Sequence, residues 1–361
     1  MKSNKITLIS LFAGCGGLDL GFEKAGFEIV WTNEFDKTIW ETYEYNFPET
    51  LLDKRSITEI SSKEIPQAHG IIGGPPCQSW SEAGALRGLE DHRGQLFFDY
   101  IRVLKDKEPL FFLAENVSGM LMERHRGAFR KILDNFRDLN YNVSCSLLNA
   151  KQYGVPQDRK RIIIVGYHKI MGKCFSFPQK SLDLVTIRDA IFDLKDSARQ
   201  AKEYNKTNGE RLAAANHEYM NGGFSTIYMS RNRVRSWDEQ SFTIQAGGRH
   251  APIHPQAPKM VLIGKDRRIF EPGKENLYRR LTVRECARIQ TFPDNFVFKY
   301  KSVSDGYKMV GNAVPVEFAR RIAVEIYKDI TDFLIASGKL EDAHGQSFER
   351  EAERDYVSNP F

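Results

Sequence analysis

The sequence predicts an α/β fold in which a doubly wound parallel β-sheet forms a large domain, followed by a smaller, irregular domain. Three observations indicate this fold. Short apolar runs alternate with helical spacings in the N-terminal half, a glycine-rich turn follows the first run, and the alternation stops at about Phe177. A chain of 361 residues with 41% hydrophobic content is long enough to bury two cores.

Each apolar run is typical of a buried strand. Between the first two runs, Leu18, Phe22 and Ala25 recur at helical spacing, and Gly26 stands where a helix would end. Strands that alternate with helices in this way predict βαβ units and therefore a parallel sheet. The predicted strands are residues 6–12, 29–31, 71–72, 110–114 and 162–165.

The boundaries follow from changes in this pattern. We expect the large domain to span residues 1–176 and the irregular domain to span residues 177–278, where glycines, prolines and polar stretches dominate. Residues 279–337 return to the large domain: Thr282 and Glu285 form a T-x-x-E capping box that opens a helix, and residues 318–334 form another. Residues 338–361 predict a flexible charged tail, because they hold too few apolar side chains to pack.

Composition excludes several classes of protein. The five cysteines (Cys15, Cys77, Cys145, Cys174 and Cys286) form an odd set without a C-x-x-C pair, which argues against a disulfide framework and a zinc site, so no metal is predicted. The net charge of +5 is compatible with a polyanionic partner. Because no apolar run reaches the length of a membrane span, we expect a cytoplasmic protein that does not contact membranes.

A glycine-rich turn predicts a ligand site after the first strand. Gly14 and Gly16 open the first helix, and glycines let backbone N–H groups approach a ligand closely. Asp19 replaces the third glycine of G-x-G-x-x-G, so a dinucleotide fits less well. Glu34 follows the second strand, where a carboxylate can accept both ribose hydroxyls of a nucleoside. The alternative is a tight turn beside a solvated acid.

A second group of residues predicts a reactive thiol. Cys77 follows Pro75 and Pro76 on a stiff loop after the strand at residues 69–72, at the sheet edge where α/β proteins bind ligands. Glu115 ends the strand at residues 110–114. If the strand at residues 162–165 runs antiparallel, Arg159 and Arg161 reach the same edge. Taken singly, each of these residues is better explained as a buried cysteine, a strand-end acid or a solvated charge run, and only their convergence favours a reactive site.

In their order and spacing, six blocks resemble the cytosine-C5 DNA methyltransferases of restriction–modification systems, over nearly the whole chain to about Lys328. The blocks are residues 12–17, 75–78, 115–117, 157–161, 280–294 and 311–315. The resemblance implies a Rossmann-like methyltransferase domain that uses S-adenosylmethionine. It implies Cys77 as nucleophile, Glu115 at the ring N3, Arg159 and Arg161 near a flipped nucleotide, and Phe12, Gly14, Gly16, Glu34, Asn312 and Val314 around the cofactor.

The chemistry of such an enzyme needs this set of groups. Cytosine C5 is a weak nucleophile, but addition of a thiolate at C6 turns the ring into an enamine, and nearby arginines favour the thiolate. Glu115 would donate or share a proton at N3. Because none of these atoms is accessible inside a stacked duplex, the base must be extruded.

One block departs from the family pattern. Ser56 stands where such enzymes usually carry an Asp that hydrogen-bonds the adenine amino group. Asp53 is close in sequence and could take that role if the loop shifted. This difference concerns cofactor affinity and leaves the reaction class unchanged.

The resemblance makes residues 177–278 a target-recognition domain. Arg231, Arg233 and Arg235 alternate, which predicts that they share one face of a strand, and Arg249 is a further candidate. Arginine forks read guanine in the major groove, although phosphate contacts are an equal alternative for each of them. Residues 225–235, with the following Gln245 and Arg249, look similar to the branch of the family that methylates GGCC.

The expected partners are duplex DNA and a cognate restriction endonuclease that forms no stable complex with the chain, which we expect to be monomeric. Three alternatives stay open. An RNA methylase shares several blocks, a nicotinamide-linked oxidoreductase shares the first turn but leaves residues 75–78 unexplained, and a DNA-binding regulator without activity keeps the recognition domain. A zinc deaminase is disfavoured, because no H-x-E accompanies a P-C-x-x-C.

Overall fold

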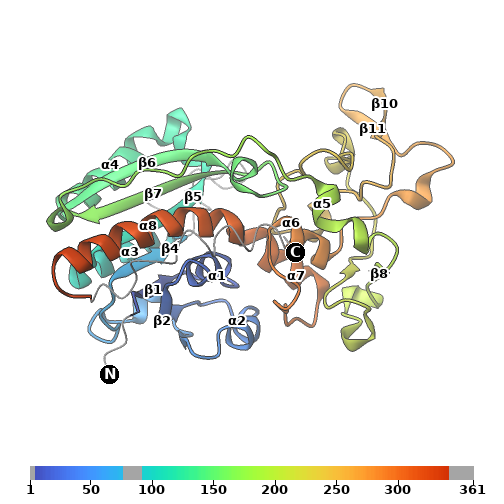
Figure 1. Ribbon diagram of the computed structural model, residues 1–361. Coiled ribbons are helices and arrows are strands. Elements are labelled where there is room, and N and C mark those ends of the chain that lie inside the picture. Colours follow the sequence, from blue (N-terminus) through green and yellow to red (C-terminus); the bar gives the residue numbers. More distant parts are fainter. Residues whose placement is uncertain (1–4, 76–91, 341–361) are drawn as a thin grey trace.

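The computed structural model describes residues 5–75 and 92–340. Its centre is a seven-stranded sheet in the order β3-β2-β1-β4-β5-β7-β6 (Figure 1). Neighbouring strands are parallel except that β7 runs antiparallel to both β5 and β6. The strands are β1 (Thr7–Leu11), β2 (Glu28–Asn33), β3 (Leu51–Asp53), β4 (Gly70–Gly73), β5 (Phe111–Val117), β6 (Tyr141–Asn149) and β7 (Lys160–His168).

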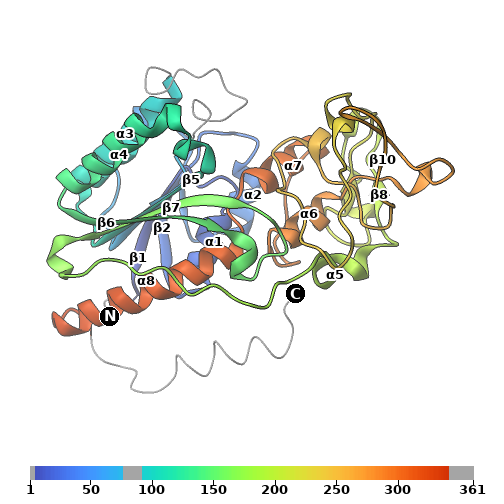
Figure 2. The same cartoon turned by 90° about the horizontal axis from the view of Figure 1, so that it is seen from above.

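Helices cover both faces of this sheet (Figure 2). The helices α1 (Gly17–Glu23) and α8 (Val316–Ala336) lie on one face, and α3 (His92–Lys107) and α4 (Arg126–Asp138) lie on the other. Successive strand residues alternate between the two cores: Leu8 packs with the first pair of helices, and Ile9 packs with the second. The doubly wound α/β fold predicted from the apolar runs is therefore confirmed.

A second lobe with little regular structure lies beyond the carboxyl ends of the parallel strands (Figures 1 and 2). It has a small core around the buried side chains of Tyr228 and Ile253. Its elements are α5 (Ile187–Ile191) and two short strand pairs, β8 (Arg199–Gln200) with β9 (Glu218–Tyr219) and β10 (Val261–Gly264) with β11 (Arg267–Ile269).

The chain from α6 (Val283–Ile289) to α7 (Val303–Asn312) packs against this second lobe, in one core that includes Ile187 and Ile244. The predicted capping box opens α6, since the Thr282 hydroxyl accepts the Glu285 backbone N–H and the Glu285 carboxylate accepts that of Thr282. The chain then returns to the sheet through α8. The small helix α2 (Trp40–Asn46) follows β2.

The predicted strand carrying alternating arginines is wrong. Residues 230–237 form no strand; Val234 makes an isolated bridge to Ile253. The chain turns immediately afterwards, because the Glu239 carboxylate accepts hydrogen bonds from the Ser236 backbone N–H at 2.7 Å and from its hydroxyl at 2.9 Å. A local side-chain contact of this kind competes with strand pairing.

Among the described residues, no helix has the length and hydropathy needed to cross a membrane. Most of the predicted charged tail, residues 341–361, lies outside the part of the chain that the structure describes.

Candidate active site

A cavity of about 430 Å³ lies at the carboxyl ends of the parallel strands. This edge is where open α/β sheets bind ligands. One end of the cavity is formed by the loop after β1 and the end of β2, and the other end by the loop after β4 and the end of β5. Five of the six predicted cofactor residues line it: Phe12, Gly14, Glu34, Asn312 and Val314.

Gly16, the sixth residue, shapes the loop from behind. Its φ of 88° is left-handed, as are those of Phe12 (56°) and Gly14 (58°), so the turn after β1 is unusually tight. A Cβ at Gly16 would lie 2.2 Å from the buried ring of Phe47. Glycine at this position therefore lets the loop pack against α2.

Glu34 is fixed by the same loop. One carboxylate oxygen accepts the Gly14 backbone N–H at 2.8 Å, and the other accepts that of Asp36 at 2.7 Å. Burial raises the pKa of Glu34 above its usual range, against these hydrogen bonds, which lower it. Since each carboxylate oxygen can accept a second hydrogen bond, the group is able to bind a pair of vicinal hydroxyls.

Ser56 and Asp53 concern the departure from the family pattern. Ser56 lines the cavity next to Ile57, at the position where an Asp is usual. Asp53 is held elsewhere: Arg55 binds both of its carboxylate oxygens, at 3.1 and 2.7 Å, and this contact lowers the pKa of Asp53. Asp53 therefore does not replace the missing carboxylate in this structure.

Phe35 is a cavity residue that the sequence analysis missed. This residue is 69% exposed and lines the cavity directly after Glu34. An exposed aromatic ring offers a flat apolar surface for a heterocycle. The signal available in the sequence was an aromatic residue beside a predicted ribose-binding acid.

Glu115 and Arg161 meet at the other end of the cavity. Nε of Arg161 lies 2.8 Å from Oε1 of Glu115, and both side chains are largely buried. The antiparallel pairing of β5 with β7 brings them together, because it sets Val117 opposite Arg161. The antiparallel strand on which their predicted convergence depended is confirmed.

Cys77 lies outside the described residues, but the chain that leads to it does not. The buried Asn116 side chain donates to the Pro75 carbonyl at 3.2 Å. A Cβ at Gly74 would lie 3.3 Å from Oε2 of Glu115, so this loop runs directly beside the carboxyl group. Residues 73–75 are also part of the cavity wall.

Arg159 takes a different place from the one predicted beside Glu115. Its side chain is 1% exposed and donates to the carbonyls of Ile244, Gly311 and Ala313 at 2.9, 3.0 and 2.9 Å. Burial lowers its pKa well below the usual value. The Arg159 guanidinium therefore binds backbone carbonyls and does not line the cavity.

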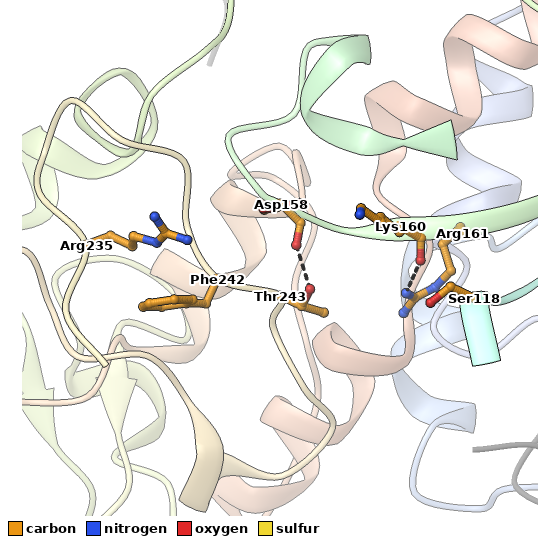
Figure 3. Close-up of a pocket in the computed structure, with 7 residues that line it drawn as sticks. All are labelled: Ser118, Asp158, Lys160, Arg161, Arg235, Phe242 and Thr243. Carbon is orange, nitrogen blue, oxygen red and sulfur yellow. Dashed lines mark hydrogen bonds between the residues drawn. The ribbon is translucent and has the colours of Figure 1, made fainter. Parts of the chain in front are cut away.

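The predicted DNA-reading arginines are spread over the second lobe. The Cζ atom of Arg235 lies 4.3 Å from the centroid of the Phe242 ring, so the guanidinium stacks on that ring. Both residues line a pocket of about 360 Å³ between the lobes (Figure 3). Arg233 folds back and donates to the Tyr228 carbonyl at 3.0 Å. Arg231 and Arg249 are exposed. The pocket between the lobes is lined by Ser118, Asp158, Lys160, Arg161, Arg235, Phe242 and Thr243.

Comparisons with known proteins agree with this arrangement. The sequence profile of the C-5 cytosine-specific DNA methylase family matches residues 6–328. The chain is 57% identical over 328 residues to the Type II methyltransferase M.FnuDI of Fusobacterium nucleatum, covering 90% of this chain and 95% of that protein. It is 57% identical over 332 residues to the Type II methyltransferase M.NgoPII of Neisseria gonorrhoeae, covering 91% and 97%.

A solved structure shows the same fold. The prophage-encoded DNA modification methyltransferase of E. coli superposes with a TM-score of 0.71 at 25% identity, over 91% of this chain and 100% of that one. A nicotinamide-linked oxidoreductase is therefore set aside. The chain belongs to the C-5 cytosine-specific DNA methylase family and is a DNA (cytosine-5-)-methyltransferase.

Proposed function

We propose that this enzyme methylates C5 of a cytosine extruded from duplex DNA, using S-adenosylmethionine as methyl donor and Cys77 as nucleophile. The observation that carries the proposal is the single cavity that joins Glu34 and Asn312 at one end to Glu115 at the other. A donor molecule held at the first end lies in the same space as a base held at the second.

The residues at the first end fit S-adenosylmethionine. The cavity volume of about 430 Å³ suits a nucleoside-sized ligand. Glu34 offers acceptors for the ribose hydroxyls, and Phe35 offers an exposed aromatic face for the adenine. Ser56 supplies a hydroxyl in place of the usual carboxylate. When bound, S-adenosylmethionine supplies an electrophilic methyl group.

At the second end, the protein activates the pyrimidine. The Cys77 sulfur forms a bond to C6, and the electron pair of the C5–C6 double bond becomes available at C5. Glu115, oriented by Arg161, holds a proton at N3 as charge develops on the ring. After C5 is methylated, a base removes the C5 proton and the carbon–sulfur bond breaks, which restores the aromatic ring and frees Cys77.

We propose that residues 177–278 form the domain that recognises the DNA target. The exposed guanidinium groups of Arg231 and Arg249 are available for guanine edges, and Arg235 lines the pocket that separates this lobe from Arg161. Similarity of residues 225–235 to the GGCC-methylating branch favours GGCC as the site. The Type II names of the relatives support a role in protecting DNA from a cognate restriction enzyme.

Bisulfite sequencing of plasmid DNA from a host that expresses the chain tests this proposal. We expect protected cytosines within GGCC and nowhere else, and none in a host that expresses Cys77→Ser. Protection at another sequence would refute the proposed target alone. Full conversion of every cytosine, with soluble protein present, would refute the proposed activity.

A further inference from the structure

A buried cluster of hydrogen bonds, which we call the Arg159 junction, links three parts of the molecule. It consists of Gln157, Arg159, Ile244, Gln290 and the turn at residues 311–313. Arg159 precedes β7 and donates to Ile244 in the second lobe and to Gly311 and Ala313 at the end of α7. One guanidinium group therefore fixes the second lobe to the end of α7.

Gln157 makes the same connection a second time. Its Oε1 accepts the Ile244 backbone N–H at 2.8 Å, and its Nε2 donates to Oε1 of Gln290 at 2.7 Å. Gln290 in turn donates to the carbonyls of Val310 and Ala313, at 2.8 and 3.2 Å. Gln157 and Gln290 are fully buried.

The backbones joined by these contacts also touch. A Cβ at Gly311 would lie 2.3 Å from the Gln245 carbonyl carbon and 2.4 Å from the Ala246 nitrogen. No side chain separates the two segments at this point. A shift of residues 244–246 therefore displaces residues 311–313 rather than being absorbed by side-chain rotation.

Both ends of the junction lead to a ligand surface. Asn312, Ala313 and Val314 line the cofactor cavity. On the other side, Thr243 lines the pocket between the lobes and donates to the Asp158 carbonyl at 2.6 Å (Figure 3). The junction therefore lies between the wall of the cofactor cavity and the wall of the pocket between the lobes.

The junction is also costly to bury. Arg159 is only 1% exposed and carries a charge, but the acceptors of its hydrogen bonds are neutral backbone carbonyls. Its Nε has no acceptor within the described part of the chain. An apolar side chain would avoid that desolvation cost but would not fix three carbonyls at once. An arginine at this position therefore fixes the geometry of three backbone carbonyls at the expense of stability.

We propose that Arg159 is a positioning residue that couples target binding to cofactor binding. When DNA fixes the second lobe, residues 244–246 hold the turn at residues 311–313 in the geometry that binds the cofactor, through Arg159 and Gln157. This inference rests on the proposed function, because it assumes that DNA and S-adenosylmethionine are the two ligands.

Calorimetry on the full chain measures this coupling. The dissociation constant of S-adenosylhomocysteine is determined with and without a saturating GGCC duplex, and the ratio of the two values is the coupling factor. The variants are Arg159→Lys, which keeps the charge but loses the fork, and Gln157→Met, which removes the second connection and leaves Arg159 in place. By linkage, the cofactor product must change DNA affinity by the same factor, which checks each value.

Arg284→Lys is the matched control. Arg284 is also 1% exposed and also donates to three backbone carbonyls, those of Ala215, Pro293 and Phe296, at 2.9, 3.1 and 2.7 Å. None of these residues lines the cofactor cavity. Its substitution therefore reproduces the loss of a buried arginine fork without breaking the junction.

We expect a coupling factor of at least about fivefold in the wild type and in Arg284→Lys, falling below about twofold in Arg159→Lys and Gln157→Met. A general loss of stability does not lower this ratio, because saturating DNA restores the folded state and an unfolded fraction then weakens cofactor binding only in the absence of DNA. The inference would be overturned if a junction variant that folds kept the coupling factor of the wild type. It would also be overturned if the wild type itself had a coupling factor of one. Neither result would contradict the proposed function. Failure of the wild type to bind S-adenosylhomocysteine would instead refute the proposed cofactor, and failure to bind the GGCC duplex would refute the proposed target.

Discussion

Nε of Arg161 lies 2.8 Å from Oε1 of Glu115, and the two side chains reach each other from adjacent antiparallel strands. The other oxygen of Glu115 lies next to Gly74, on the loop that leads to Cys77. The arginine therefore orients the carboxyl group so that one oxygen is held by the sheet and the other is directed toward the reactive loop. This arrangement suits a group that must hold a proton at one fixed point of a substrate ring.

The substitution Glu115→Gln tests this role. The amide keeps the size of the side chain but cannot transfer a proton, so we expect methyl transfer to slow by about 10²–10⁴-fold. The affinities for DNA and cofactor should change little, because Glu115 contacts the cytosine ring and not the DNA backbone or the cofactor. Single-turnover transfer of labelled methyl groups measures the rate, and a rate equal to that of the wild type would refute the proton-holding role.

Glu34→Gln tests the cofactor end. An amide cannot accept at both positions, so at least one hydrogen bond from the loop or the ribose is lost. Because hydrogen bonds to charged groups contribute more than neutral ones, we expect the dissociation constant of S-adenosylhomocysteine to rise roughly tenfold to a hundredfold. Glu49→Gln, which changes an exposed acid, is the control. Equal affinities in the two variants would remove Glu34 from the cofactor site.

His254 should contribute a loss of stability in mild acid, opposed by Asp19 and Glu23, whose pKa values burial raises to about 6 and about 7. This imidazole is fully buried, and burial lowers its pKa from 6.5 to about 4. Between those pH values the unfolded imidazole binds a proton that the folded one does not, so the contribution of His254 to the free energy of unfolding decreases as pH falls, by up to about 3 kcal/mol. Urea unfolding at pH 7 and pH 4.5 measures this contribution as the difference between the wild type and a variant without the imidazole.

The variant His254→Gln provides the comparison. It lacks the titrating group, so the stability of the wild type relative to this variant should fall between pH 7 and pH 4.5. Glu285, whose pKa is lowered to about 2, stays ionised until lower pH and contributes its own loss only below about 4.5. Parallel curves for wild type and His254→Gln would show that His254 does not cause the decrease.

Gly16→Ala should disturb the turn after β1. The new Cβ meets the Phe47 ring, which is itself buried and stacked on Tyr43 with ring centroids 4.6 Å apart, and the backbone φ of 88° disfavours any side chain. We expect a loss of about 1–3 kcal/mol in stability and weaker cofactor binding. Thermal unfolding measures the first effect. Gly264→Ala, with open space around the Cβ position, should stay near the wild type.

The strands that the sequence predicted are those buried on both faces. The strands β1, β2, β4, β5 and β7 carry continuous apolar runs, because helices cover both sides of the sheet. The edge strand β6 was missed, because Cys145 and Leu147 are exposed and polar residues interrupt its pattern. Apolar periodicity therefore predicts the centre of this sheet better than its edge.

The sequence predicted those site residues whose positions are determined by the end of a strand. Glu115 and Arg161 belong to strands, and the strand pairing brings them together. Arg159 does not: it precedes β7, in a segment whose backbone pairs with Ser241 of the second lobe, and this long-range pairing leaves no periodic pattern in the sequence. The alternating arginines failed as a strand for a different reason, since a local turn competes with strand pairing there.

The most direct test of the account is a covalent trap. A GGCC duplex in which 5-fluorocytosine replaces the target base is incubated with the enzyme and S-adenosylmethionine, and the mixture is run on a denaturing gel. Since fluorine does not leave C5 as a proton does, elimination stops and the sulfur of Cys77 stays bound to C6. We predict an adduct for the wild type and none for Cys77→Ser. A wild-type enzyme that methylates ordinary GGCC but forms no adduct with the fluorinated duplex would contradict covalent catalysis by Cys77.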